Sequence, residues 1–236
     1  MELSVVIPVR NEAENIAPLV AEIRAALHEA AFEIVYVDDG STDATAAEIA
    51  RLALDFPALR LIRHRESCGQ STAVRSGVKA ARGLWIATLD GDGQNDPADI
   101  PRLWTLARES ASPFLLVAGE RRRRRDSWVK RQSSRIANRV RSALLGDHTP
   151  DTGCGLKVFR RELFLDLPYF SHMHRFLPAL VLRAGGAVVS VPVNHRPRER
   201  GVSKYGTLDR LAVGLVDLLG MLWLKRRARV PEILPE

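Results

Sequence analysis

The sequence predicts an α/β protein with a mostly parallel central sheet flanked by helices. Short apolar runs of strand length alternate with segments whose apolar residues recur at helical spacing. The first run, Leu3–Val9, is almost continuously apolar, as expected for a strand covered on both faces. Strands connected through helices are joined by right-handed crossovers, so the sheet is expected to be mostly parallel.

The first half of the chain alternates regularly between predicted helices and strands. Helices are expected to start near Asn11, Ala44 and Gly69, because apolar residues then follow at three- and four-residue steps. The second of these helices ends near Leu54, before Pro57. The strands between and after these helices are expected at Phe32–Val37, Leu59–Arg63 and Leu84–Leu89.

The second half is less regular and contains a strongly basic segment. Helices are expected at Asp99–Arg108 and at Thr207–Leu224, from their periodic apolar residues. Between them, the five consecutive arginines Arg121–Arg125 precede an amphipathic basic stretch, Trp128–Leu145, and such a run is not buried without partners. Strands are expected at Phe114–Ala118, Val158–Arg160 and Ala187–Val193, the last at a sheet edge because it contains Pro192.

Length and composition suit one α/β domain with a C-terminal appendage. The net charge of +7 and the pI near 10.0 predict a polyanionic partner, which leaves nucleic acid, an anionic membrane surface and a phosphorylated substrate open. Cys68 and Cys154 are too few for a disulfide framework, and their spacing from other cysteines and histidines argues against zinc. The N-terminus runs straight into a strand without a signal-peptide pattern, so we expect a cytoplasmic protein with reduced thiols.

Two clusters of carboxylates follow predicted strands. Asp90 and Asp92, in Asp90-Gly91-Asp92-Gly93-Gln94, come directly after Leu84–Leu89, and Asp38-Asp39 ends another apolar run. Ligands of open α/β sheets bind outside the carboxyl ends of the strands, and closely spaced carboxylates suit Mg²⁺, which usually keeps phosphate oxygens of a substrate in its shell. The two clusters together predict a pocket for a metal and a nucleotide.

Each cluster also has a purely structural interpretation. Asp-Gly after a strand is common turn chemistry, because aspartate caps its own backbone and glycine accepts a positive φ. In the same way, Asp39–Asp43 could serve only as a turn and helix cap. The presence of two clusters, each behind a strand, favours a binding site.

The motifs together resemble a known family. The stretches Val5–Glu12, Val37–Asp43 and Asp90–Pro97 resemble glycosyltransferase family 2, which has the GT-A nucleotide-diphospho-sugar transferase fold. The second half is similar to the polyprenyl- and dolichyl-phosphate sugar synthases of that family, of the dolichyl-phosphate mannosyltransferase type. The stretches that carry this similarity are Asp151–Arg161, His174–Leu180 and His195–Gly206.

The resemblance implies a donor site. Asp90 and Asp92 would lie at the metal and the donor diphosphate, with Gln94 as a further metal ligand and Mg²⁺ or Mn²⁺ as the cofactor. Asp39 would accept hydrogen bonds from the base of a UDP- or GDP-sugar. The other residues expected at the nucleotide are Pro8, Arg10, Glu12, Val37, Gly69 and Gln70, although the family often has an aromatic residue where Arg10 stands.

The resemblance also implies an acceptor site for a phosphate. Arg121 would be catalytic together with Asp90 and Asp92, and would face the acceptor phosphate with Lys130, Arg131, Ser134 and Arg135. Arg200, Ser203 and Lys204 would belong to a loop over the donor phosphates. Cations and a hydroxyl group suit phosphate. A phosphate monoester, with its second pKa near ~6, is already an anionic nucleophile, so no general base is required and direct attack inverts the anomeric centre.

These implications predict residues 1–206 as a catalytic domain and residues 207–236 as an amphipathic membrane-surface helix with a basic tail. An aromatic residue beside a basic cluster, as in Trp223 followed by Lys225-Arg226-Arg227, is typical of a membrane interface. We therefore expect an inverting transferase on the cytoplasmic face of a membrane. Its partners would be a nucleotide sugar, a polyprenyl phosphate, an anionic lipid surface and a membrane protein, but no nucleic acid.

Two alternatives remain open on the sequence alone. A family 2 transferase could add the sugar to a sugar hydroxyl group of a polysaccharide or glycolipid, and this reaction needs an additional acidic residue as a base. A basic nucleic-acid-binding protein could use Arg121–Arg125, but the chain has no recognised nucleic-acid-binding motif.

Overall fold

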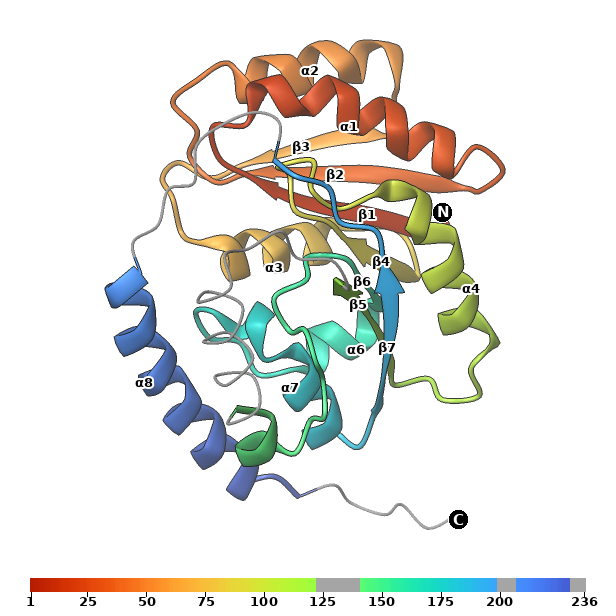
Figure 1. The fold of residues 1–236 in the computed structure, drawn as a ribbon. Helices are drawn as coiled ribbons and strands as arrows, with labels where there is room; N and C mark the ends of the chain where they lie inside the picture. The colour runs from red at the N-terminus through yellow and green to blue at the C-terminus, as the bar shows by residue number, and fades with distance from the viewer. Residues whose placement is uncertain (122–140, 199–206, 230–236) are drawn as a thin grey trace.

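A seven-stranded sheet with the order β3-β2-β1-β4-β6-β5-β7 forms the centre of the protein (Figure 1). The computed structural model describes residues 1–121, 141–198 and 207–229, with side chains from residue 214 onward in the last range. Among the described strands, β6 runs antiparallel to both of its neighbours, and the other pairs are parallel. The strands are β1 Leu3–Val9, β2 Phe32–Asp38, β3 Leu59–Arg63, β4 Trp85–Thr88, β5 Leu115–Arg121, β6 Lys157–Arg160 and β7 Ala187–Val193.

Helices cover both faces of this sheet, so the predicted α/β architecture is confirmed. Helices α1 (Ala13–Ala26), α2 (Thr45–Asp55) and α4 (Ile100–Glu109) pack on one face. Helices α3 (Gln70–Ala80), α6 (Arg161–Asp166) and α7 (Leu177–Arg183) pack on the other, and α8 (Thr207–Arg226) lies outside them (Figure 1). The short helices α6 and α7 were not anticipated from the sequence, because one or two turns carry too little periodicity. Two 3₁₀ turns complete the described elements, η1 at Pro97–Asp99 and η2 at Met173–Arg175.

Strand β1 lies between β2 and β4, and its near-continuous apolar sequence follows from this position. Leu3, Val5, Ile7 and Val9 pack toward α1, α2 and α4, whereas Val6 packs toward α3 on the opposite face. Because β2, β1 and β4 are parallel, their carboxyl ends meet at one edge of the sheet. The acid clusters that follow β2 and β4 therefore flank the end of β1.

The other end of the sheet contains a buried charge. Glu33 on β2 is fully buried and accepts hydrogen bonds from the Ser4 hydroxyl at 2.6 Å and from Arg60 Nη1 at 2.8 Å. The backbone N–H of Arg82 also donates to it. Burial raises the pKa of the Glu33 carboxyl, but these hydrogen bonds outweigh burial and hold that pKa below its ordinary value. Glu33 thus joins β1, β2, β3 and the end of α3.

The fold shows which strand lies at the edge of the sheet and whether a described helix could cross a membrane. β7 lies at the edge of the sheet, as predicted from Pro192, whose missing N–H cannot serve a central strand. None of the helices in the described part of the chain is long and apolar enough to cross a membrane.

We predict that Glu33→Ala lowers the free energy of unfolding by about 3 kcal/mol, because it leaves buried donors without an acceptor. The stabilisation by Glu33 is fully present above the ordinary carboxyl pKa of 4.5 and is lost as the pH falls through the lower folded-state pKa. Urea denaturation at several pH values measures both effects. The exposed pair of Glu48 and Arg51 provides the control, and Glu48→Ala should leave the midpoint nearly unchanged. Equal effects of the two substitutions would contradict this account.

Candidate active site

The first turn of α3 connects the two acid clusters. The backbone N–H of Gly69 donates to Oδ2 of Asp39 at 2.9 Å, and the next side chain, Gln70, donates from Nε2 to Oδ1 of Asp90 at 2.9 Å. Gly69 has a φ of 87°, which a residue with a side chain rarely adopts, and it begins the helix directly. The positive end of the α3 dipole therefore faces both clusters, where it favours negative charge.

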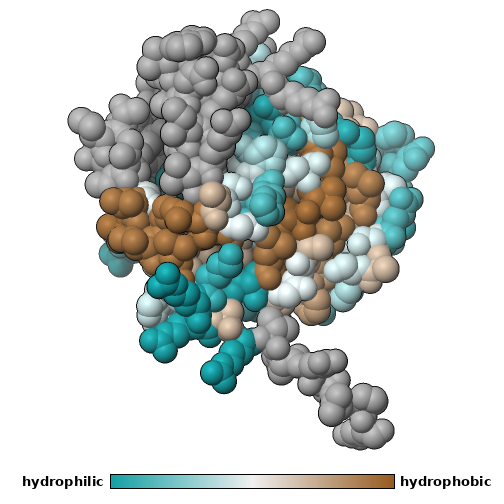
Figure 2. All heavy atoms as spheres, turned by 60° about the horizontal axis from the view of Figure 1, so that its bottom comes forward, coloured by the Kyte–Doolittle hydropathy of each residue, from teal (hydrophilic) through white to brown (hydrophobic). Residues whose placement is uncertain are grey.

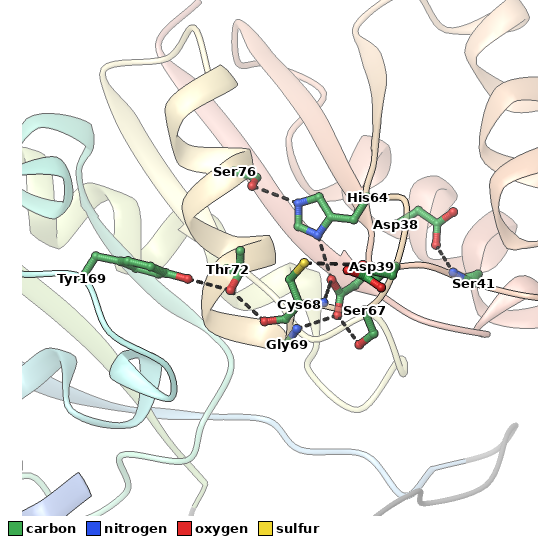
Figure 3. Close-up of polar contacts among 11 residues, drawn as sticks. Asp38, Asp39, Ser41, His64, Ser67, Cys68, Gly69, Thr72, Ser76 and Tyr169 are labelled. Atoms are coloured by element: carbon green, nitrogen blue, oxygen red, sulfur yellow. Dashed lines mark hydrogen bonds and ion pairs between the residues drawn. The ribbon is translucent and has the colours of Figure 1, made fainter.

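The Asp39 carboxylate accepts four hydrogen bonds from the protein (Figure 3). Oδ1 lies 2.7 Å from Nδ1 of His64 and accepts from the backbone N–H of Cys68 at 2.8 Å. Oδ2 accepts from the Ser67 hydroxyl at 2.8 Å and from Gly69. Burial raises the pKa of the Asp39 carboxyl, but these four donors outweigh burial and keep the pKa below its ordinary value. A nucleotide base that binds Asp39 would therefore have to share or replace one of these donors.

Asp90 lies in a different electrostatic environment. Its pKa rises to about 6, because burial and the neighbouring Asp92 carboxylate both oppose its ionisation. Lys157, Arg121 and the hydrogen bond from Gln70 act in the opposite direction. Two carboxylates that repel each other in a partly dry site are stabilised by a divalent cation.

Lys157 is a functional candidate that the sequence analysis missed. It is 4% exposed on β6, its ammonium donates to the carbonyl of Cys154, and burial lowers its pKa. Because β6 lies between β4 and β5, the Lys157 backbone pairs with Thr88 at the carboxyl end of β4 and with Ala118 in the middle of β5. A lysine inside the apolar run Leu156–Phe159 was the available signal, since such a charge is buried only with compensation.

Arg121, at the end of β5, forms a bidentate ion pair with Asp151. Nε and Nη2 of Arg121 donate to the two carboxylate oxygens at 2.7 and 2.8 Å, and Asp151 is 4% exposed. Arg121, the first of the five consecutive arginines, is thus held against the domain by its ion pair with Asp151. Arg121 belongs to the same electrostatic environment as Asp90 and Lys157, and its catalytic role stays a prediction.

The loop between Asp151 and Lys157 approaches Asp90 so closely that a side chain at Gly155 would displace the Asp90 carboxylate. A Cβ atom at Gly155 would lie 2.6 Å from Oδ1 of Asp90 and closer still to Oδ2. The carbonyl of Gly155 accepts a hydrogen bond from the Thr88 hydroxyl at 2.7 Å, which fixes the loop on β4. Backbone therefore forms one wall of the Asp90 site.

The residues expected near the nucleotide lie around the end of β1. Pro8 is on β1, Val37 is fully buried on β2, and Arg10 is exposed just after β1. Glu12 accepts from Asn15 Nδ2 at 2.6 Å and pairs with Arg198. Arg198 was not expected here, and no sequence spacing connects it with Glu12.

Gln94 lies in the turn that holds Asp92. The backbone N–H of Gln94 donates to Oδ1 of Asp92 at 3.1 Å, and its side-chain Nε2 donates to the carbonyl of Arg196 at 3.3 Å. Arg196 in turn forms a bidentate pair with Glu22 on α1. The segment around Arg196 therefore packs against the Asp92 turn and restricts the side chain of Gln94.

The donor set fits a hard divalent cation. Asp90, Asp92 and Gln94 all carry oxygen ligands within the turn after β4, and burial together with the neighbouring Asp92 carboxylate raises the pKa of Asp90. The expected acceptor residues Lys130, Arg131, Ser134 and Arg135, and the expected loop residues Arg200, Ser203 and Lys204, lie outside the described residues.

A mostly parallel sheet with carboxylates gathered behind β2 and β4 is the arrangement expected of the GT-A fold, and the comparisons agree. Residues 4–167 match the model of "Glycosyl transferase family 2", and the chain belongs to this family. It is 36% identical over 232 residues, 96% of this chain and 68% of the relative, to a dodecaprenyl-phosphate galacturonate synthase of Rhizobium johnstonii. It is 35% identical to an undecaprenyl-phosphate 4-deoxy-4-formamido-L-arabinose transferase of Edwardsiella ictaluri, over 93% of this chain and 67% of the relative.

Solved structures share the fold at lower identity. Glucosyl-3-phosphoglycerate synthase from Mycobacterium tuberculosis with Mg²⁺ and UDP superposes with a TM-score of 0.70 at 18% identity, over 98% of this chain and 80% of that chain. The same enzyme with Mn²⁺, UDP-glucose and glycerol 3-phosphate gives 0.66 at 17% identity, over 98% of this chain and 81% of that chain. The predicted fold and family are confirmed, and divalent metals accompany the nucleotides in these neighbours.

We predict that Gly155→Ala reduces turnover by about 10²-fold, the scale expected when a catalytic group moves by about 1 Å. The added methyl group would displace the Asp90 carboxylate, so Mn²⁺ affinity, measured by electron paramagnetic resonance, should fall in parallel. Gly214→Ala is the control, because a Cβ atom there meets no atom within 4 Å. Unchanged Mn²⁺ affinity in Gly155→Ala would show that Asp90 does not hold the metal.

Proposed function

We propose that this protein transfers one sugar from a nucleotide diphosphate sugar to a polyprenyl phosphate, with inversion and with Mg²⁺ or Mn²⁺ as cofactor. The observation that carries the proposal is the pair of acid clusters held on either side of β1 by the first turn of α3. Relatives named for dodecaprenyl- and undecaprenyl-phosphate products, aligned over more than nine-tenths of the chain, support the acceptor class.

The donor diphosphate would lie between Asp90, Asp92 and the α3 N-terminus. Asp90, Asp92 and Gln94 would hold the cation, which neutralises charge on the diphosphate. Backbone N–H groups at the start of α3 add positive potential on the same side, where a leaving diphosphate gains charge. Lys157 and Arg121 are cations in the environment of Asp90 and offset part of the repulsion between Asp90 and Asp92.

A phosphate acceptor is consistent with the way in which the acidic residues of the site are already engaged. Transfer forms a bond between an acceptor phosphate oxygen and the anomeric carbon, and breaks the bond from that carbon to the nucleoside diphosphate. A sugar hydroxyl acceptor would instead need a free carboxylate to remove its proton. Asp151, the further acid in the environment of Lys157, is committed to the bidentate pair with Arg121. Phosphate needs no such base, because it is already ionised at neutral pH.

The base of the nucleotide would lie over the β2 end, beside Asp39 and the loop Ser67–Gly69. The Ser67 hydroxyl is the donor to Asp39 that can rotate away most easily, because the others are backbone groups or a histidine fixed on both sides. Uracil and guanine both present an N–H group to such a carboxylate. Pro8, Arg10, Glu12 and Val37 surround the same end of β1.

We predict metal-dependent transfer of label from a panel of UDP- and GDP-sugars into undecaprenyl phosphate. Asp92→Ala should lower the rate by at least about 10²-fold, the loss typical when stabilisation of developing charge is removed. The measurement counts label entering the organic phase with Mg²⁺ or Mn²⁺, and identifies the sugar. Metal-dependent hydrolysis of the donor without lipid product would instead favour a sugar hydroxyl acceptor.

Helix α8 would bring the protein to an anionic membrane on its cytoplasmic face. Leu218, Met221 and Leu222 pack onto the domain, whereas an outer set of large apolar residues stays exposed. The exposed set consists of Leu215, Val216, Leu219 and Trp223. Hydrophobic and hydrophilic surfaces lie side by side on this face of the molecule (Figure 2). Arg226 and Arg227 follow the outer face, and Arg227 stacks on Trp223, so apolar and basic groups are combined as at a bilayer surface.

We predict that Leu219→Glu weakens binding to vesicles containing phosphatidylglycerol by about tenfold, because an exposed leucine no longer enters the lipid. Flotation at low and high salt measures this binding, and binding of the unchanged protein should decrease with salt. Leu54→Glu, at a residue 82% exposed on α2, is the matched control and should float normally. If both variants float like the unchanged protein, α8 does not dock to lipid.

A further inference from the structure

Three side chains with different ligand chemistry meet near the base end of the proposed nucleotide pocket. Asp39 follows β2, His64 follows β3, and Cys68 precedes α3, and their ligand atoms all lie within 4.8 Å of one another (Figure 3). A carboxylate oxygen, an imidazole nitrogen and a thiol sulfur are the three protein ligands of zinc. His64 and Cys68 lie in the same loop between β3 and α3, but Asp39 comes from the end of β2, so the spacing along the sequence does not indicate the full set.

A metal ion could bind between His64 and Asp39 in place of their hydrogen bond. Nδ1 of His64 lies 2.7 Å from Oδ1 of Asp39, and Nε2 lies 2.9 Å from the hydroxyl of Ser76. In the metal-free protein, Nδ1–H of His64 donates to Asp39 and Nε2 accepts from the Ser76 hydroxyl. When a cation binds, the ring would carry its proton on Nε2 and donate it to Ser76, so that the electron pair of Nδ1 faces the ion. A cation can then replace the proton between nitrogen and oxygen, if the two atoms separate by about half an ångström to suit metal–ligand distances of about 2 Å.

We propose that Asp39, His64 and Cys68 bind Zn²⁺, at a site distinct from the one expected for Mg²⁺ or Mn²⁺ at Asp90 and Asp92. The thiolate and the imidazole select a borderline-soft ion, whereas Mg²⁺ prefers oxygen ligands only. One thiolate and one carboxylate balance the charge of one Zn²⁺. The fourth coordination position is filled by water.

The surroundings of these ligands are already arranged as in metal sites. Ser76 fixes the far nitrogen of His64, and Ser67 and Gly69 hold Oδ2 of Asp39, leaving Oδ1 on the side of the histidine and the cysteine. Such contacts orient ligands and tune their affinity for the metal. Cys68 is exposed, and its Sγ makes a contact of 3.6 Å with the carbonyl of Glu66. A metal ion can therefore reach the thiol from solvent, and the side chain can turn toward Asp39 because only one weak contact holds it among the residues that the structure describes.

Zinc binding would have a consequence for the donor, and this consequence rests on the proposed function. A metal ion bonded to Oδ1 of Asp39 occupies the carboxylate that we expect to meet the nucleotide base. Zn²⁺ would then inhibit competitively with the nucleotide sugar, even with Mg²⁺ at Asp90 and Asp92.

The test is titration of the full chain with Co²⁺ and then Zn²⁺, with Co²⁺ as the spectroscopic probe. We expect one equivalent to produce a thiolate-to-cobalt charge-transfer band, which one equivalent of Zn²⁺ removes. Cys68→Ser should abolish the band, and Ser76→Ala should weaken binding by about 10- to 100-fold. Cys154→Ser and Asp92→Ala should keep the band, because these residues belong to the Asp90 side of the molecule.

A band that survives in Cys68→Ser, or that disappears in Cys154→Ser, would overturn the proposed zinc site, as would the absence of a band in the unchanged protein. Addition of UDP with Mg²⁺ separates the zinc site from the proposed function. Displacement of Zn²⁺ by UDP supports both. Retention of Zn²⁺ with UDP bound would leave the zinc site in place, and would mean that the base does not bind at Asp39.

Discussion

Two clusters of carboxylates lie on either side of strand β1, and hydrogen bonds from the first turn of α3 hold both of them in place. Acids gathered at one sheet edge repel one another, and the N-terminus of a helix offsets this repulsion with its N–H groups and its dipole. The left-handed backbone of Gly69 lets the loop reach Asp39 and begin the helix at once, so that Gln70 meets Asp90. The positions of Asp90, proposed to hold the metal, and of Asp39, proposed to meet the base, thus depend on one short segment.

The negative charges of the carboxylates at the ends of β2 and β4 are offset by different groups. This difference suits the two carboxylates to different roles. Asp39 is surrounded by neutral donors and one histidine, so it stays ionised without a cation. Asp90 faces another carboxylate, and although Lys157 and Arg121 act in favour of its ionisation, burial and Asp92 outweigh them. A carboxylate of the first kind suits recognition of N–H groups, and one of the second kind suits metal binding.

The sequence was sufficient for the parallel half of the fold and for the acid clusters, because buried strands and amphipathic helices leave periodic patterns and parallel strands align their ends. It did not reveal that β6 pairs antiparallel with its neighbours, because the residue pattern of a four-residue strand does not indicate the direction in which the strand runs. Lys157, His64 and Arg198 were missed for a related reason. Each acts through a partner far away in the sequence, at Asp90, Asp39 and Glu12, and such pairs are created by topology rather than by spacing.

The position of β6 also constrains the order in which the chain can fold. β6 follows β5 in the sequence but lies between β4 and β5, so it joins the β3-β2-β1-β4 unit to the β5-β7 pair within the sheet. On a ribosome, the first unit can form its nucleotide-facing edge long before β6 emerges, because N-terminal parts fold first during synthesis. The loop that carries Asp151 and Gly155 arrives together with β6. Insertion of β6 into the sheet and completion of the backbone wall beside Asp90 therefore happen together.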